Sequence, residues 1–259
     1  MDIEQYAELL TQQIIFLALA EDHARRDITT NSLEDYDRKV IAEVTAKENG
    51  IISGTGVFID TFKTLDSNIF GKVFKEDGSE VQKGDVVLEI EGMESTILKA
   101  ERTALNFLQR LSGIATLTKK FVDKLKPFHT TLLDTRKTTP GMRYLEKKAV
   151  KDGGGSNHRM NLEDMAMVKD NHIRMAGSIS NAVKKIREKF PGKKIEVEVK
   201  NLTELQEALS LEVDMIMLDN FSPEKLKEAV QAVKQTQNHR PPKLEISGNV
   251  NLENIREKA

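Results

Sequence analysis

The feature that most constrains the fold is a unit that repeats after residue 130, in which a short apolar run is followed by a helical pattern. The apolar runs occupy residues 130–136, 165–171, 195–200, 215–220 and 243–249. Strands that alternate with helices form a parallel sheet with crossover helices. Five such units favour a β/α barrel over an open sheet, although periodicity does not by itself choose between the two.

The first part of the chain has a different pattern. Apolar side chains at helical spacing predict an amphipathic helix over residues 3–20. These side chains are Ile3, Tyr6, Leu10, Ile14 and Leu17. From residue 39 onward, short β-rich runs are separated by glycines, which is typical of a small antiparallel sheet. The runs are residues 40–47, 50–60, 69–76 and 85–92. We therefore expect a compact α+β domain here.

A longer helical pattern begins at Glu101 and is ended by Pro127. Its candidate buried side chains are Leu105, Leu108, Ile114, Leu117, Phe121 and Leu125. Gly113 interrupts the pattern and can mark a bend or a close packing contact. We expect this helix to connect an N-terminal domain, residues 1–105, with a second domain, residues 106–259.

The composition excludes several classes of function. The chain has no cysteine, so disulfides, thiolate nucleophiles and cysteine-ligated zinc or iron–sulfur sites are excluded. A net charge of −2 gives no global electrostatic reason to expect nucleic acid as a partner. No apolar run approaches the roughly 18 residues needed to span a bilayer, and the amino-terminal residues lack the pattern of a signal peptide. We expect a cytoplasmic protein that binds neither nucleic acid nor membrane.

Cationic side chains are dense between Thr130 and Asn171, on turns that follow apolar runs. They are Arg136, Lys137, Arg143, His158, Arg159 and Lys169. Such a cluster predicts a pocket for a small polyanion. Residues 153–155 and 247–249 could each present backbone N–H groups to a phosphate, the second group at a helix N-terminus. For residues 153–155 a flexible turn is the alternative.

Charged side chains also recur at the carboxyl ends of the predicted strands. In residues 195–200 the apolar side chains must face the helices, so Glu196, Glu198 and Lys200 point inward. We expect Glu198 and Lys200 to lie at the edge where barrel enzymes bind ligands, and the deeper Glu196 to be a structural partner. The other strand ends carry Asp134, Arg136, Lys137, Lys169, Asp170, Asp219 and Ser247-Gly248-Asn249.

Residues 77–95 resemble the strand–turn–strand pattern of biotinyl and lipoyl carrier domains. In those domains a lysine at the hairpin tip carries the prosthetic group, whereas the tip here would be residues 91–94, Glu-Gly-Met-Glu. We expect a structural hairpin, with a non-catalytic carrier module as an alternative function.

Eight motifs along the chain are specific enough to indicate a family. They are EDHARRDITT, ERTALNFLQRLSGIAT, DTRKTTPGMRYLEKKAV, GGGSNHR, KDNH, EVEV, LDNF and EISGN. In this order they resemble quinolinate phosphoribosyltransferase, also called nicotinate-nucleotide pyrophosphorylase (carboxylating), over nearly the whole chain.

The resemblance implies an α/β fold, with an N-terminal α/β sandwich domain followed by an incomplete TIM-like β/α barrel. It also implies a homodimeric pentosyltransferase of NAD biosynthesis. Enzymes of this family condense quinolinate with phosphoribosyl pyrophosphate in the presence of Mg²⁺. They release pyrophosphate and carbon dioxide and form nicotinate mononucleotide.

The resemblance also assigns roles to individual residues. Arg102 would reach the site of the partner subunit. The substrate-binding residues of the chain's own site would be Arg136, Lys137, His158, Arg159, Lys169, Glu198, Asp219, Ser247, Gly248 and Asn249. The catalytic residues among them would be Lys137, Lys169, Glu198 and Asp219. Glu198 and Asp219 would hold Mg²⁺ directly or through water.

A related phosphoribosyltransferase with another ring substrate, such as nicotinate, is the alternative within the enzyme class. Four cationic residues favour a dicarboxylate substrate instead: Arg102, Arg136, His158 and Arg159. Two features depart from the family pattern. Asn249 stands where a second glycine is frequent, and the chain stops at Ala259, so the barrel domain is expected to lack its last strand unit.

Overall fold

The computed structural model describes residues 3–236 and 240–259, and the chain divides into two compact units. The first unit contains residues 1–126 and 131–158, and the second contains residues 127–130 and 159–259. These units do not coincide with the predicted division at residue 105, because one helix continues through that position to Leu125. In the described part of the chain, no helix combines the length and apolar character that a membrane span requires.

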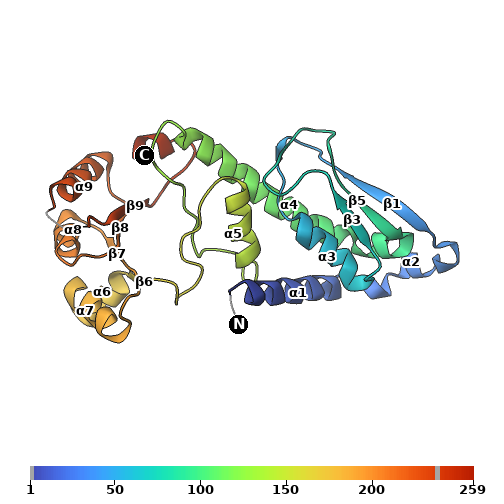
Figure 1. The fold of residues 1–259 in the computed structure, drawn as a ribbon, viewed down its shortest axis with the longest axis horizontal. Coiled ribbons are helices and arrows are strands. Elements are labelled where there is room, and N and C mark those ends of the chain that lie inside the picture. Colours follow the sequence, from blue (N-terminus) through green and yellow to red (C-terminus); the bar gives the residue numbers. More distant parts are fainter. Residues whose placement is uncertain (1–2, 237–239) are drawn as a thin grey trace. The chain divides into compact units, whose positions relative to one another are not determined.

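The first unit is built on an antiparallel sheet with strand order β1-β5-β3 (Figure 1). Its strands are β1 (Lys39–Thr45), β3 (Phe70–Val73) and β5 (Val86–Met93). A separate pair joins β2 (Gly50–Ile51) to β4 (Glu80–Val81). Along β1, Val40, Ala42 and Val44 pack against the core, whereas Ile41 on the other face is exposed. This is the period of two of a half-buried strand.

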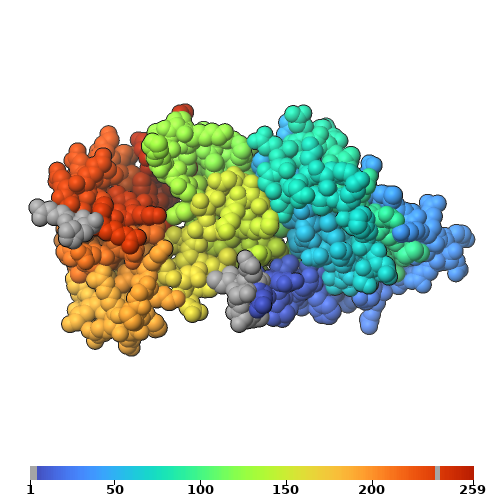
Figure 2. All heavy atoms as spheres, in the orientation of Figure 1, coloured from blue at the N-terminus to red at the C-terminus, as the bar shows by residue number. Residues whose placement is uncertain are grey.

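Four helices share one hydrophobic core with this sheet. They are α1 (Ile3–Glu21), α3 (Thr55–Leu65), α4 (Glu94–Leu125) and α5 (Arg143–Asp152). The same unit contains the short helix α2 (Ile28–Asn31) and the 3₁₀ turns η1 (Ala24–Arg26) and η2 (Glu34–Tyr36). Phe58 and Phe62 of α3 pack edge to face in this core, with ring centroids 5.1 Å apart. α5 packs against α4, and its yellow-green atoms lie beside the green atoms of α4 in Figure 2. The predicted α/β sandwich is confirmed.

The prediction of a strand over residues 50–60 is wrong beyond Ile51, because α3 begins at Thr55. Gly54 has a φ of 99°, in the left-handed region that favours glycine, and this backbone conformation ends the extended segment. The Asp77 carboxylate then accepts hydrogen bonds from the N–H groups of Gly54 and Thr55, both at 3.0 Å, at the start of α3. An apolar run rich in Val and Phe therefore folds as a helix, since a capped N-terminus and burial of one face outweigh β propensity.

The predicted hairpin over residues 77–95 is also wrong. β4 pairs with β2, whereas β5 pairs with β1 and β3. β5 runs directly into α4 at Glu94, so residues 91–94 form a strand-to-helix junction rather than a turn between two strands. The segment therefore lacks the exposed tip on which a carrier domain depends.

Two predicted helical faces differ from the observed ones. In α1, Tyr6 is 51% exposed and Leu17 is 63% exposed, while Ala7, Ile15 and Leu19 are buried. Both faces of α1 carry apolar residues, so periodicity alone does not identify the face that packs on α3. In α4, which starts seven residues before the predicted Glu101, Leu108 and Leu125 are buried as expected, but Leu117 is exposed.

The second unit contains a parallel sheet whose four strands follow the order of the chain, β6-β7-β8-β9 (Figure 1). The strands are β6 (Ala166–Val168), β7 (Ile195–Val199), β8 (Met215–Asp219) and β9 (Lys243–Ser247). The helices are α6 (Asp170–Ala176), α7 (Ile179–Lys189), α8 (Leu202–Leu209), α9 (Pro223–Gln235) and α10 (Ile255–Lys258). Ser222 caps α9 by accepting from the Lys225 N–H at 3.4 Å. The β/α alternation of an incomplete barrel is confirmed.

The alternation along β7 places apolar and acidic side chains on opposite faces. Ile195, Val197 and Val199 are buried in a core with α7, α8 and α9. Glu196 and Glu198 therefore lie on the other face, as predicted. Glu196 is completely buried, which agrees with its expected structural position.

The predicted strand over residues 130–136 is not formed, and the only bridge in this segment of the described structure joins Leu133 to Ser156. The segment is held by side-chain hydrogen bonds instead, as described below. The prediction also missed α6 and made the last helix too long, because α10 begins only at Ile255.

Candidate active site

Two of the predicted cations, Arg136 and Lys137, lie on an irregular segment of the first unit between Asp134 and Thr139. The Arg136 side chain is half-buried, and its Nε atom has no hydrogen-bond partner among the described residues. Lys137 is exposed, and its N–H donates to Thr135 Oγ1 at 3.0 Å. A buried donor without a partner is costly in a folded protein unless a ligand accepts from it. Arg136 is therefore suited to bind an anionic group.

A buried ion pair anchors the start of this segment. Lys147 of α5, only 1% exposed, is ion-paired with Asp134, and its Nζ also donates to the carbonyl oxygen of His158 at 3.1 Å. Asp134 accepts two further hydrogen bonds, from Asn157 Nδ2 at 2.5 Å and from the His158 N–H at 2.9 Å. Two predicted site segments, around Arg136 and His158, are thus tied to one buried lysine.

A second anchor holds the end of the same segment. Glu146, the neighbour of Lys147, accepts from the Thr139 N–H at 3.1 Å and from Thr139 Oγ1 at 2.7 Å. Arg110 of α4 donates to Glu146 Oε1 at 2.8 Å and to Thr139 Oγ1 at 2.9 Å. Burial raises the pKa of Glu146, but the hydrogen bonds from Arg110 and Thr139 outweigh burial and leave the pKa below its ordinary value.

The structure excludes one of the two glycine segments as a phosphate cradle. The N–H groups of Gly153, Gly154 and Gly155 donate to carbonyl oxygens of α5, at Ala149, Lys151 and Val150. A Cβ on Gly153 would lie 2.3 Å from the Ala115 carbonyl oxygen of α4. These glycines terminate α5 and allow it to approach α4 closely, so the alternative interpretation as a turn is correct.

The second unit places its predicted residues in layers at the carboxyl edge of the parallel sheet. Glu198 pairs with Met217 of β8, and Met217 pairs with Glu245 of β9. Asp219 and Ser247, which are paired with each other, form the next layer toward the carboxyl ends. Paired residues on neighbouring strands point to the same face. Strand register alone therefore brings Glu198, Asp219 and Ser247 to one face of the sheet.

A lysine–glutamate pair lies at this edge. Lys169 Nζ donates to Glu198 Oε2 at 2.6 Å, with the lysine 42% exposed and the glutamate 13% exposed. The Lys169 N–H donates to His172 Nδ1 at 3.0 Å, which ties Lys169 to the start of α6. Next to this pair, the hydrogen bond from Lys200 lowers the pKa of Asp170 and raises that of Lys200. Arg159 lies outside this edge group and donates to the Met165 carbonyl oxygen at 3.0 Å.

Asn220, which was not among the predicted site residues, joins Asp219 to the segment after β9. Its Nδ2 donates to Asp219 Oδ2 at 3.0 Å, and its Oδ1 accepts from Asn249 Nδ2 at 3.3 Å. Gly248 has a φ of 96°, and a Cβ there would lie 2.1 Å from Asn220 Oδ1. Ser247 to Asn249 do not stand at a helix N-terminus as predicted, because α10 begins only at Ile255. Backbone geometry, rather than a helix dipole, distinguishes this segment.

The donor atoms at this edge are suited to a hard divalent cation. The carboxylates of Glu198 and Asp219 and the amide oxygens of Asn220 and Asn249 are oxygen ligands, which Mg²⁺ prefers. Glu198 is already paired with Lys169. Asp219 is therefore the better placed of the two predicted metal ligands.

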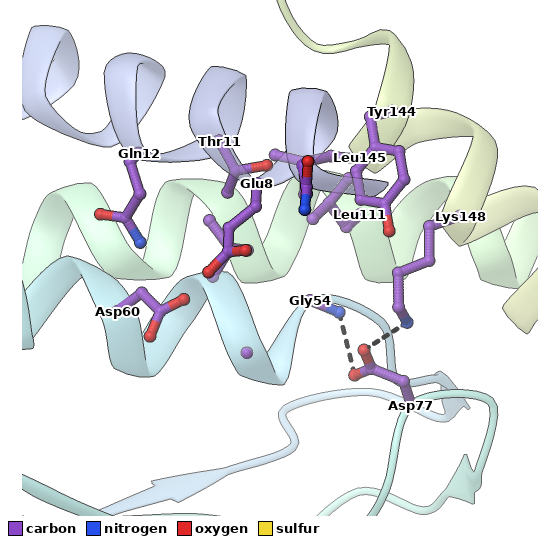
Figure 3. Close-up of a pocket in the computed structure, with 13 residues that line it drawn as sticks. Glu8, Thr11, Gln12, Gly54, Asp60, Asp77, Leu111, Tyr144, Leu145 and Lys148 are labelled. Atoms are coloured by element: carbon purple, nitrogen blue, oxygen red, sulfur yellow. Dashed lines mark hydrogen bonds and ion pairs between the residues drawn. The ribbon is translucent and has the colours of Figure 1, made fainter. Parts of the chain in front are cut away.

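The remaining predicted residue, Arg102, is exposed on α4 in the first unit. A pocket of about 570 Å³ in the same unit contains none of the predicted site residues (Figure 3). At one end Lys148 of α5 donates to Asp77 at 2.6 Å, and Glu8 and Asp60 line the opposite part. Burial, with a smaller contribution from Glu8, raises the pKa of Asp60, although Lys63 opposes the shift.

Comparison with known proteins gives consistent matches over most of the chain. The model of the quinolinate phosphoribosyl transferase N-terminal domain matches residues 27–112, and the model of the C-terminal domain matches residues 114–259. A Synechocystis protein named probable nicotinate-nucleotide pyrophosphorylase [carboxylating] is 42% identical over 238 residues, covering 92% of this chain and 80% of the relative.

Solved structures of proteins with similar names also match this chain. A crystal structure titled NadC from Streptococcus pyogenes is 40% identical, with a TM-score of 0.87, and the match covers 94% of this chain and 85% of that one. The nicotinate-nucleotide pyrophosphorylase from Francisella tularensis is also 40% identical, with a TM-score of 0.88 and coverage of 96% and 86%.

Proposed function

This chain belongs to the quinolinate phosphoribosyltransferase family, and we propose on that premise that it condenses quinolinate with phosphoribosyl pyrophosphate. The products are nicotinate mononucleotide, pyrophosphate and carbon dioxide. The reaction makes the chain a pentosyltransferase of de novo NAD synthesis, and we place it in the cytoplasm. Within this family, the observation that carries the proposal is the row of charged and polar groups at the carboxyl edge of the parallel sheet, led by the Lys169–Glu198 pair.

Quinolinate carries two carboxylates, so its site must supply cationic donors. Arg136 offers a buried Nε that no described residue accepts from, and Lys137 is exposed beside it. His158 and Arg159 complete the proposed set of carboxylate ligands. Charge-assisted hydrogen bonds of this kind are roughly twice as strong as neutral ones, which suits selection of a dicarboxylate over a monocarboxylate.

The acidic residues act on the ribose. Loss of pyrophosphate from C1′ leaves positive charge on the ring, which is oxocarbenium-like. The carboxylates of Glu198 and Asp219 stabilise this charge and accept hydrogen bonds from ribose hydroxyls. Lys169, paired with Glu198 at 2.6 Å, orients that carboxylate and offers its remaining protons to an anionic substrate group. Lys137 is the second cation that we assign to the chemical step.

Ser247, Gly248 and Asn249 bind a phosphate of the cosubstrate in this proposal. Gly248 and Asn249 have consecutive positive φ values of 96° and 50°. Successive N–H groups in such a turn can converge on an anion. The Asn220 side chain supports the turn from the neighbouring strand end.

Mg²⁺ is the proposed cofactor, and when bound it neutralises charge on the pyrophosphate group. Asp219 would hold it, directly or through water, with Glu198 as the second candidate ligand. The Asn220 amide fixes the Asp219 carboxylate through a 3.0 Å hydrogen bond and so limits its rotation.

Attack of the pyridine nitrogen on C1′ makes the ring cationic, and the adjacent positive charge stabilises the electron pair that remains on the ring carbon when its C–CO2 bond breaks. A proton from solvent then adds to that carbon and completes nicotinate mononucleotide. The role of Arg136 and its neighbours is to hold the ring in position while this happens.

We further propose a homodimer in which Arg102 of each chain serves the site of the partner. Arg102 is exposed on α4, and α1 exposes several large apolar side chains. These are Tyr6, Leu9, Phe16 and Leu17. Exposed apolar groups gathered on one element are typical of an interaction surface.

The direct test is incubation of the purified chain with quinolinate, phosphoribosyl pyrophosphate and Mg²⁺, followed by chromatography for nicotinate mononucleotide. We expect product only when all three are present. Product from nicotinate but not from quinolinate would replace this proposal with the related transferase of another ring substrate. Absence of product from both would contradict it.

A further inference from the structure

We propose that Glu146 and Lys147, two consecutive residues of α5, act as positioning residues that hold the Arg136–Lys137 segment for quinolinate binding. The inference rests on the proposed function and goes beyond the predicted substrate-binding residues, because neither Glu146 nor Lys147 contacts the substrate in it.

The two residues hold opposite ends of one short segment. Lys147 pairs with Asp134 at the start of the segment, and Glu146 accepts two hydrogen bonds from Thr139 at its end. Arg136 and Lys137 lie between these points on backbone that belongs to no helix or strand. A segment without a hydrogen-bonded ladder is otherwise free to sample many conformations, so its geometry depends on such anchors.

Lys147 also fixes the second segment that carries a proposed quinolinate ligand. Its Nζ donates to the His158 carbonyl oxygen at 3.1 Å, while Asp134 accepts from the His158 N–H at 2.9 Å. The backbone of His158 is thus held on both sides by a single ion pair. One buried lysine therefore sets the positions of Arg136 and His158 together.

These contacts are buried, so they differ from the weak ion pairs of a protein surface. The side chains of Lys147 and Asp134 are 1% and 7% exposed, and that of Glu146 is 10% exposed. A buried charge is tolerated only when opposite charge and hydrogen bonds satisfy it. Removal of either charge leaves the other without its partner, so the segment is expected to shift or open.

α5 supplies a matched control. Lys148 follows Lys147 directly, but it faces the pocket in Figure 3, where it pairs with Asp77 at 2.6 Å and with Asp152 at 2.8 Å. It makes no contact with residues 134–139 in the interactions that the described structure shows. Lys147→Met and Lys148→Met therefore remove the same charge from adjacent positions of one helix, with only the first touching the proposed site.

The experiment compares steady-state kinetics of Glu146→Gln, Lys147→Met, Lys147→Arg and Lys148→Met. Displacement of a substrate ligand by about 1 Å can cost up to 100-fold in rate. We expect the KM for quinolinate to rise about tenfold or more in Glu146→Gln and Lys147→Met, with the KM for phosphoribosyl pyrophosphate changed less than about threefold. Lys147→Arg should recover part of the loss, and Lys148→Met should match the wild type.

A second readout does not depend on activity. Arg136 and Lys137 are trypsin sites, so opening of the segment can be measured as the rate of cleavage after these residues, followed by mass spectrometry. Cleavage there should accelerate about tenfold in Glu146→Gln and not in Lys148→Met. Glu146→Gln preserves the size of the side chain, so it tests the proposal even if Lys147→Met fails to fold.

The outcomes are separable. Wild-type KM values and cleavage rates in both Glu146→Gln and Lys147→Met would overturn the inference. A fall in kcat with both KM values unchanged would also overturn it, because that pattern means loss of folded enzyme. A wild-type chain that forms no nicotinate mononucleotide contradicts the proposed function instead, and the cleavage rates then decide the question of the anchors alone.

Discussion

The two units of this chain hold their charged residues by different means. In the second unit, Glu198, Asp219 and Ser247 reach one face of the parallel sheet because of strand register. In the first unit, Arg136 and Lys137 lie on irregular backbone, and two buried side chains of α5 anchor it. A sheet edge thus positions functional groups through its backbone, whereas a loop depends on particular side chains. Substitutions near each group should therefore have different consequences.

The largest effect is expected at the loop. Arg136→Ala removes the guanidinium whose buried Nε lacks a partner among the described residues. Loss of one member of a buried charge pair costs about 2–5 kcal/mol, so the KM for quinolinate should rise about 100-fold or more. Steady-state kinetics with quinolinate as the varied substrate measures this rise, with Arg38→Ala, an exposed residue paired with Glu94, as the control. An unchanged KM for quinolinate would remove Arg136 from the site.

Substitutions at the carboxyl edge of the parallel sheet should lower kcat rather than raise the KM for quinolinate. Glu198→Gln keeps the shape of the side chain but removes the charge that pairs with Lys169 and stabilises the ribose cation. Removal of one preorganised electrostatic group typically lowers kcat by about 100-fold or more. We expect that loss with little change in the KM for quinolinate. A kcat within about threefold of the wild type would contradict the assigned role, and Glu188→Gln, which breaks an exposed pair with Lys185, is the control.

A smaller effect is expected at residues 247–249, the proposed phosphate-binding segment, where the backbone conformation of Gly248 can be tested. Gly248→Ala places a Cβ 2.1 Å from Asn220 Oδ1 at a φ of 96°. A strained residue of this kind costs about 1–3 kcal/mol, and we expect the KM for phosphoribosyl pyrophosphate to rise about tenfold. Gly192 also has a positive φ, 84°, but a Cβ there would meet no other atom, so Gly192→Ala should leave both KM values unchanged. Equal behaviour of the two variants would show that Gly248 has no special role.

The smallest effect concerns acid stability of the loop anchor. The folded-state pKa of Glu146 lies below its ordinary value of 4.5, because hydrogen bonds from Arg110 and Thr139 outweigh the effect of burial. Its contribution to the free energy of unfolding is therefore present above pH 4.5 and is lost as the pH falls through the folded pKa. Glu146→Gln should be less stable than the wild type at pH 7, and the two should converge as the pH falls below 4.5. Urea unfolding at several pH values measures the difference, and a constant gap would contradict the account.

The two regions also differ in how far the sequence predicted them. Alternation along residues 195–200 predicted that Glu198 faces away from the helices, because a strand exposes every second residue to one face. Nothing in the sequence of α5 predicts the role of Lys147, since a lysine among helical charges usually lies in solvent. Its burial follows from contacts with Asp134 and His158, 13 and 11 residues away, which no local pattern encodes.

The errors in the predicted secondary structure have a similar cause. Residues 55–60 have the composition of a strand, yet Gly54 and the Asp77 cap direct them into α3. Asp77 lies 22 residues beyond Thr55, so the decisive contact is invisible to periodicity. Long-range polar contacts account for the misassigned segments at 50–60 and 130–136.

The central claim, phosphoribosyl transfer with decarboxylation, is tested most directly by the fate of one carboxyl group. The chain is incubated with phosphoribosyl pyrophosphate, Mg²⁺ and quinolinate labelled in the carboxyl group next to the ring nitrogen, and labelled carbon dioxide and nicotinate mononucleotide are measured together. The account predicts equal amounts of the two products, and an equal decrease of both in Arg136→Ala when quinolinate is below saturation. Nucleotide that retains the label, or release of labelled carbon dioxide without nucleotide, would contradict it.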